Sequence, residues 1–81
     1  MPANNDQRFR GVVASVLGIS PEQVNDQLNP DGIDTWDSLN HINLIAALEQ
    51  EFSIMLPAGS LAANQSVRSL KTLLVEHGVE I

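Results

Sequence analysis

Residues 37–52 read Asp-Ser-Leu-Asn-His-Ile-Asn-Leu-Ile-Ala-Ala-Leu-Glu-Gln-Glu-Phe, and the interpretation of the rest of the chain depends on this stretch. Its larger apolar groups recur three or four residues apart, which is the spacing of one face of an α-helix. The pattern predicts a helix over about 38–52 that turns one face into the core. The side chains expected on that face are His41, Leu44, Ile45, Leu48 and Phe52.

Two more segments have a helical period. From about residue 5 to 17, the apolar stripe predicts a helix that Gly18 ends. Ser66 is a capping residue at the start of a last helix, which is expected to end at His77-Gly78. The inward positions are Phe9, Val12, Val13, Val16 and Leu17 in the first segment and Val67, Leu70, Leu73 and Leu74 in the last.

The remaining segments are expected to hold only short structure. Ser20-Pro21-Glu22-Gln23 begins a short helical turn reaching about Gln27, and residues 60–63 are expected to form another such turn. The sequence Asn29-Pro30-Asp31-Gly32 is typical of a turn. The fold class is therefore all-α, a small antiparallel four-helix bundle with three longer helices and one or two short ones. We expect one domain over 1–81, with residues 1–4 as a flexible tail.

Composition excludes several classes of partner. The formal charge is −6, from ten acids against four cations, and there is no cysteine. Nucleic acids and anionic membranes are attracted by clustered cations, which this chain lacks, so neither is an expected partner. A protein with a basic patch is the expected partner. No apolar run has membrane-spanning length and no signal peptide is recognisable, which predicts a cytoplasmic location and, for so small a domain, a monomer.

The outer face of the helix over 38–52 mixes aliphatic and polar groups, and two interpretations of it stay open. Its side chains can flank a wide core stripe, as is common in small bundles. They can also form a docking patch with an apolar centre and a polar rim. The residues concerned are Leu39, Asn40, Ile42, Asn43, Ala46, Glu49 and Gln50, together with Asp37 just before the helix.

Ser38 begins this helix, where a serine is most often only an N-cap. A helix start also tolerates a phosphate, because free N–H groups and the positive end of the helix dipole meet there. A catalytic triad with Asp37 and His41 is rejected, since His41 belongs to the core stripe and the chain has no nucleophile elbow. A calcium loop is rejected too, because Gln27 and Ser38 occupy positions where it needs carboxylates.

The chain resembles the acyl carrier proteins over about residues 5–77. The resemblance is carried by Asp37-Ser38-Leu39, by Leu48-Glu49 with Phe52, and by the capped start Ser66-Val67-Arg68-Ser69-Leu70. Carriers of bacterial fatty acid synthesis are often acidic at positions where this chain has Asn40, Asn43 and Gln50, and Trp36 stands where a small residue is usual. The chain is therefore more similar to a stand-alone carrier for a dedicated pathway.

The resemblance implies a function and a cofactor. A 4′-phosphopantetheine arm donated by coenzyme A would be attached to Ser38 and carry acyl or aminoacyl cargo as a thioester, without catalysis by the chain itself. It implies as partners a phosphopantetheinyl transferase and an activating ligase, a transferase or a synthase. Apolar cargo would fold back among Ile45, Leu48, Ile54 and Leu61. The alternative is a helical interaction module in which Ser38 is only a helix cap.

Overall fold

The computed structural model describes residues 5–56 and 66–81, which contain three α-helices and no strand. Helix α1 spans Asn5–Leu17, α2 spans Ser38–Phe52 and α4 spans Val67–Glu76. Two 3₁₀ turns, η1 (Pro21–Gln23) and η2 (Pro30–Gly32), lie in the connection between α1 and α2. The expected all-helical bundle is confirmed, whereas the predicted tail 1–4 and short helix 60–63 lie outside the described residues.

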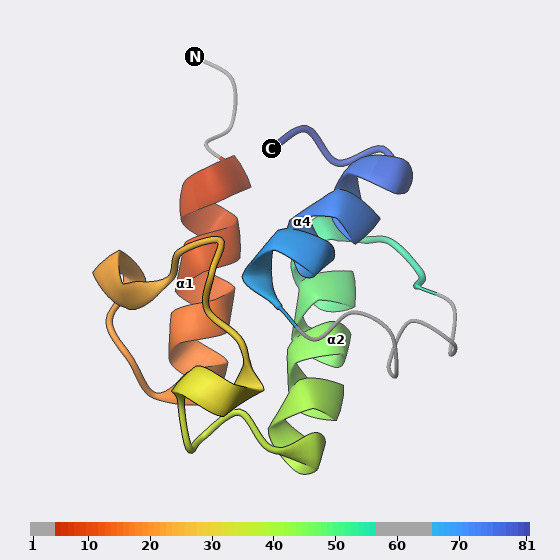
Figure 1. The fold of residues 1–81 in the computed structure, drawn as a ribbon. Coiled ribbons are helices and arrows are strands. Elements are labelled where there is room, and N and C mark those ends of the chain that lie inside the picture. The colour runs from red at the N-terminus through yellow and green to blue at the C-terminus, as the bar shows by residue number, and fades with distance from the viewer. Residues whose placement is uncertain (1–4, 57–65) are drawn as a thin grey trace.

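Helices α1 and α2 run antiparallel and pack on each other, and η2 lies beside the end of the bundle where α2 begins (Figure 1). One cluster of buried apolar side chains joins all three helices to the connection. From α2 it includes Leu44, Ile45 and Leu48, as predicted, while His41 is buried beside them and Phe52 is half-buried against the cluster. The core face of α2 was therefore predictable from its period alone.

Helix α1 ends where the sequence predicted, and the cause of this ending is local. Gly18 has a φ of 71°, a left-handed conformation that a residue without Cβ adopts at little cost. The Ile19 N–H then donates to the Ala14 carbonyl at 3.0 Å, which closes the last turn. The inward face is narrower than expected, because Val12 and Val16 are only half-buried flanks while Ala14 is buried.

The connection over 18–37 is less helical than predicted. The helical turn expected to reach Gln27 stops at Gln23, because Val24 takes an extended conformation that carries its side chain into the core. Gln23 still makes the predicted reciprocal cap, its Oε1 accepting from the Ser20 N–H at 2.9 Å. Further along, the Leu28 carbonyl accepts from the Val67 N–H at 3.0 Å and ties the connection to α4.

Trp36 is a core residue that the pattern analysis did not identify. It is the only tryptophan in the sequence and is 3% exposed, although it lies in an irregular segment two residues before α2. Among the other apolar residues of the connection, Val24 is buried, and Leu28 and Ile33 are half-buried. Trp36 therefore adds the largest apolar anchor at the point where the chain enters α2.

Helix α4 begins and ends as its sequence predicts. The Ser66 Oγ accepts from the Ser69 N–H at 3.0 Å, the geometry of an N-cap. Val67, Leu70, Leu73 and Leu74 are buried, and Gly78 follows the helix with a φ of 90°. Val79 then folds back, is itself buried, and donates its N–H to the Leu74 carbonyl at 3.0 Å.

The two faces of α2 should respond differently to truncation. Leu48 is completely buried, so Leu48→Ala should lower the free energy of unfolding by about 2–5 kcal/mol through lost burial and a residual cavity. Leu39 is 67% exposed, so the matched change Leu39→Ala should cost less than about 1 kcal/mol. Urea unfolding followed by circular dichroism measures both. Equal losses would show that the outer face belongs to the core.

Candidate functional site

Ser38 is the first residue of α2 and is exposed, but it is not the cap of the helix. Asp37 is the N-cap, and its Oδ1 accepts from the Asn40 N–H at 2.8 Å. The interpretation of Ser38 as an N-cap is therefore wrong. A carboxylate at the preceding residue is an equally good cap and also matches the positive end of the helix dipole.

This exchange of roles leaves the hydroxyl of Ser38 unengaged by the described residues. The Ser38 Oγ stands at the start of a helix of 15 residues, in solvent, next to an exposed leucine. A helix N-terminus presents N–H groups and a positive potential, and both favour a phosphate ester at this place. The site therefore fits a phosphodiester attached through the serine oxygen.

Three consecutive residues before Ser38 are each bonded to the first turn of α2. The Asn40 Nδ2 donates to the Thr35 carbonyl at 2.7 Å, and the Trp36 Nε1 donates to the His41 Nδ1 at 3.1 Å. The rings of Trp36 and His41 also stack, with centroids 6.1 Å apart and planes at 28°. With the Asp37 cap, these bonds bracket Ser38 from both sides.

The predicted docking residues on α2 mostly face solvent. Leu39 is 67% and Ile42 is 51% exposed, so the expectation that both stay exposed is confirmed. The face also presents Asn43, Ala46 and Gln50, and Gln50 lines a shallow groove against α1. These exposed residues of α2 are all uncharged, and they carry either apolar or amide side chains.

Asn40 and Glu49 were predicted on the same surface, but the structure gives both an internal partner. Asn40 is half-buried and holds Thr35, as described above. Glu49 is half-buried, and its Oε2 accepts from the Leu56 N–H at 2.7 Å, which fastens the chain that follows α2. Glu51, the other carboxylate of α2, pairs with Arg8 at 2.8 Å. The carboxylates of α2 are therefore engaged within the molecule.

The residues predicted for cargo only partly lie together in the described chain. Ile45 and Leu48 are buried on the inner face of α2, and Ile54 is half-buried against the same core. Leu61 lies outside the described residues. An apolar cavity for cargo stays a prediction.

His41 has no geometry for catalysis with Ser38. It is 5% exposed, on the core face of α2, and its Nδ1 accepts from Trp36. Its Nε2 is buried and has no hydrogen-bond partner among the described residues. The rejection of a triad therefore agrees with the placement of both side chains. Within residues 5–56 and 66–81, no group of three histidines or acids could hold a metal ion.

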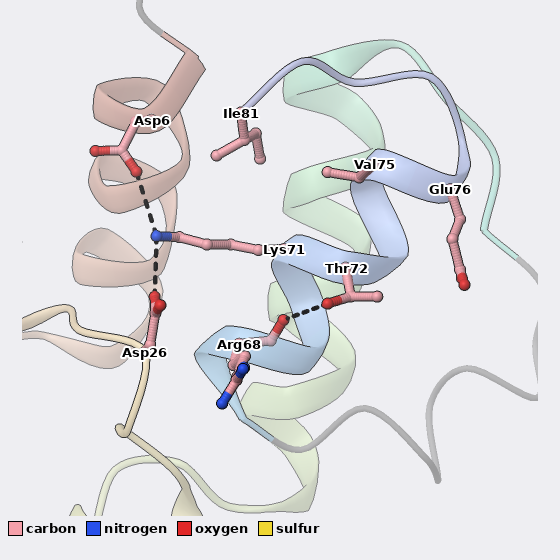
Figure 2. A pocket seen from close by; sticks show the side chains of 8 residues that line it. All are labelled: Asp6, Asp26, Arg68, Lys71, Thr72, Val75, Glu76 and Ile81. Atoms are coloured by element: carbon pink, nitrogen blue, oxygen red, sulfur yellow. Dashed lines mark hydrogen bonds and ion pairs between the residues drawn. The ribbon is translucent and has the colours of Figure 1, made fainter.

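A hollow between α1 and α4 is lined by five charged residues, Asp6, Asp26, Arg68, Lys71 and Glu76 (Figure 2). Lys71 reaches across it and pairs with Asp6 at 3.4 Å and with Asp26 at 3.1 Å, joining α4 to α1 and to the connection. Such exposed pairs contribute only about 0–1 kcal/mol each. Because the lysine is neutralised and Ser38 does not line this hollow, we assign it a structural role.

Comparisons with known proteins place this site in a family. The family model of the phosphopantetheine attachment site matches residues 7–74, a range that includes most of α1, all of α2 and most of α4. The chain belongs to this family, that of the acyl carrier proteins. It is 30% identical over 73 residues to a protein named "Acyl carrier protein" from Zymomonas mobilis subsp. mobilis, covering 88% of this chain and 91% of that relative.

Members of this family carry a covalently attached 4′-phosphopantetheine and serve as carriers. The exposed hydroxyl at a helix N-terminus fits that group, because the ester needs an oxygen that is free of other bonds. In the described part of the chain, no helix is long and apolar enough to cross a membrane.

Sequence patterns point to Ser38 but not to the hydrogen bonds on either side of it. From the sequence, Trp36 is only an unusual neighbour and His41 only a residue of the core stripe. The sequence did contain an indication of this bond. A tryptophan and a histidine lie five residues apart, one on each side of the helix start, and both carry polar ring atoms that are unusual in a core. Each supplies what the other needs there, one N–H donor and one ring-nitrogen acceptor.

The assignment of Asp37 rather than Ser38 as the N-cap of α2 can be tested by substitution. Asp37→Ala should lower the free energy of unfolding by about 0.5–2 kcal/mol, because the Asn40 N–H loses its acceptor. Ser38→Ala should leave it within about 0.5 kcal/mol of the wild type, since the hydroxyl makes no described bond. Thermal unfolding followed by circular dichroism measures both. A larger loss for Ser38→Ala would return the capping role to the serine.

Proposed function

We propose that this protein is an acyl carrier whose 4′-phosphopantetheine arm is attached to Ser38 and holds acyl or aminoacyl cargo as a thioester. One observation carries the proposal: an exposed serine hydroxyl without a described bond follows the Asp37 cap, inside the segment that the family model matches. No other described serine combines exposure, a preceding carboxylate cap and a helix start.

Loading this site is a group transfer that a separate enzyme performs. The Ser38 Oγ attacks the phosphorus of coenzyme A that bears pantetheine, and a P–O bond forms. The P–O bond to the adenosine 3′,5′-bisphosphate leaving group breaks, and the serine proton passes to a base of the transferase. The carrier supplies the nucleophilic oxygen and its position. The histidine of α2 is turned into the core, so it does not supply that base.

The outer face of α2 is the proposed docking surface for the phosphopantetheinyl transferase and for the enzymes that load or use the cargo. Support comes from Leu39 and Ile42, two large apolar side chains that stay exposed on the helix that Ser38 begins. The other exposed residues of α2 are uncharged, and Asn43 and Gln50 supply amide groups, while the exposed carboxylate of Asp37 lies just before the helix. Such a face favours apolar contact and hydrogen bonding over electrostatic steering.

An interaction module without a cofactor is the second candidate, and the exposed apolar pair on α2 would serve it equally. Its account of Ser38 as a helix cap has lost its basis, because Asp37 holds that role. Attachment of the arm is the direct discriminator between the two candidates.

The site of attachment can be tested by intact mass spectrometry. After incubation with coenzyme A and a promiscuous phosphopantetheinyl transferase, the wild type should gain the mass of one phosphopantetheine group, and Ser38→Ala should gain none. Ser15→Ala, a change of an exposed serine on α1, should be modified like the wild type. Modification of Ser38→Ala would place the arm elsewhere, and an unmodified wild type would remove the carrier function.

The docking surface can be tested through the salt dependence of that reaction. Leu39→Ser should lower kcat/KM about tenfold or more at every salt concentration, because an apolar contact is not screened. Asn43→Glu with Gln50→Glu adds two carboxylates to the face, and should make kcat/KM depend more steeply on salt than in the wild type. Steady-state kinetics between low and high salt measure both. A wild type as salt-sensitive as the double variant would contradict an uncharged docking face.

A further inference from the structure

The position of Ser38 is not determined by regular structure on its N-terminal side. The chain from Gly18 to Asp37 contains only two short 3₁₀ turns, so no helix or strand aligns the residues that lead into α2. The one backbone bond described for Trp36 is its N–H to the Ile33 carbonyl, and at 3.3 Å it is long. Some other set of contacts must hold the entry into α2.

Two side-chain hydrogen bonds hold the entry into α2, and each of them spans Ser38. One joins Thr35 to Asn40 at 2.7 Å and the other joins Trp36 to His41 at 3.1 Å. Each links a residue just before Ser38 to one in the first turn after it. The Asp37 cap lies between these two bonds and uses the Asn40 backbone, so Asn40 is held from both its main chain and its side chain.

The histidine supports a specific role for the second bond. A neutral imidazole that accepts at Nδ1 carries its proton on Nε2, and here Nε2 is buried without an acceptor. A buried donor without a partner destabilises the fold, so an aliphatic residue would serve packing better at position 41. The histidine is explained by the acceptor that it offers to the Trp36 indole.

We propose that Asn40, Trp36 and His41 are positioning residues that hold the Ser38 hydroxyl in the orientation required for phosphopantetheinyl transfer. This rests on the proposed function and assigns to it residues beyond the attachment site and the docking face. The attacking oxygen must be placed to within a fraction of an ångström for in-line displacement at phosphorus. The two bonds restrain the backbone on both sides of that oxygen while leaving the oxygen itself free to react.

The test uses two variants that each remove one donor; Asn40→Asp keeps the shape of the side chain, whereas Trp36→Phe is smaller and needs a control for lost core volume. Trp36→Phe keeps an aromatic ring in the core without its N–H, and Asn40→Asp replaces the Nδ2 donor by an oxygen. Each has a matched control. Val13→Ala truncates a fully buried side chain in α1. Asn25→Asp adds the same charge in the connection and likewise replaces an Nδ2 that donates to a backbone carbonyl, that of Gln23 at 3.3 Å.

Transfer from coenzyme A is measured by steady-state kinetics, at a temperature where circular dichroism shows each variant folded. Trp36→Phe and Asn40→Asp should lower kcat about tenfold with KM for the carrier within about twofold, because positioning is lost and docking is not. Val13→Ala and Asn25→Asp should keep the wild-type kcat. The double variant with His41→Leu and Trp36→Phe should lose no more kcat than Trp36→Phe alone, since both substitutions remove the same hydrogen bond between Trp36 and His41.

Amide hydrogen exchange tests the same two hydrogen bonds in the carrier alone, without the transferase. Amide hydrogen exchange over residues 35–41 should become faster in Trp36→Phe and Asn40→Asp than in their controls. The proposal is overturned if the controls lose as much kcat as the variants, if the variants keep the wild-type kcat, or if exchange over 35–41 is unchanged. An unmodified wild type is a separate result, because it removes the carrier function itself.

Discussion

Leu44 and Leu48 are both completely buried, and the orientation that their burial imposes on α2 is the constraint on which the site depends. A helix has only one rotation about its axis that buries this stripe. The same rotation turns Leu39 and Ile42 outward and directs His41 inward, toward Trp36. Burial of the core thus determines which groups near Ser38 are available to a partner and which are committed to the fold.

At the N-terminal end of α2, the role of helix cap and the proposed role of attachment site belong to two neighbouring residues, although one serine could have combined them. Asp37 satisfies the helix start, so the Ser38 oxygen is left for chemistry. A serine that capped its own helix would lose its bond on modification, and the helix start would be destabilised each time the arm was attached. With the cap on the neighbouring carboxylate, attachment leaves the hydrogen bonds of the first turn intact.

The charge of the protein is high but is not concentrated on the proposed docking face. Glu49 and Glu51, the carboxylates of α2, hold Leu56 and Arg8, whereas the exposed residues of the helix are apolar or carry amides. The net charge of −6 therefore describes the whole molecule rather than the surface beside Ser38. A partner recognising α2 would be selected by the shape and apolarity of its own surface.

The sequence by itself determined the helices and their inward faces and singled out Ser38 as the proposed attachment site, because these follow from periods and motifs within a few residues. The bounds of α2 and the stops at Gly18 and Gly78 are local in this sense. Local pattern also misled, since it made Ser38 the cap and extended the turn after Pro21 to Gln27. The choice between Asp37 and Ser38 as cap depends on the direction from which the chain enters the helix. Only the tertiary structure decided that direction, because Trp36 must reach the core and meet His41, and no period relates an irregular segment to a helix face.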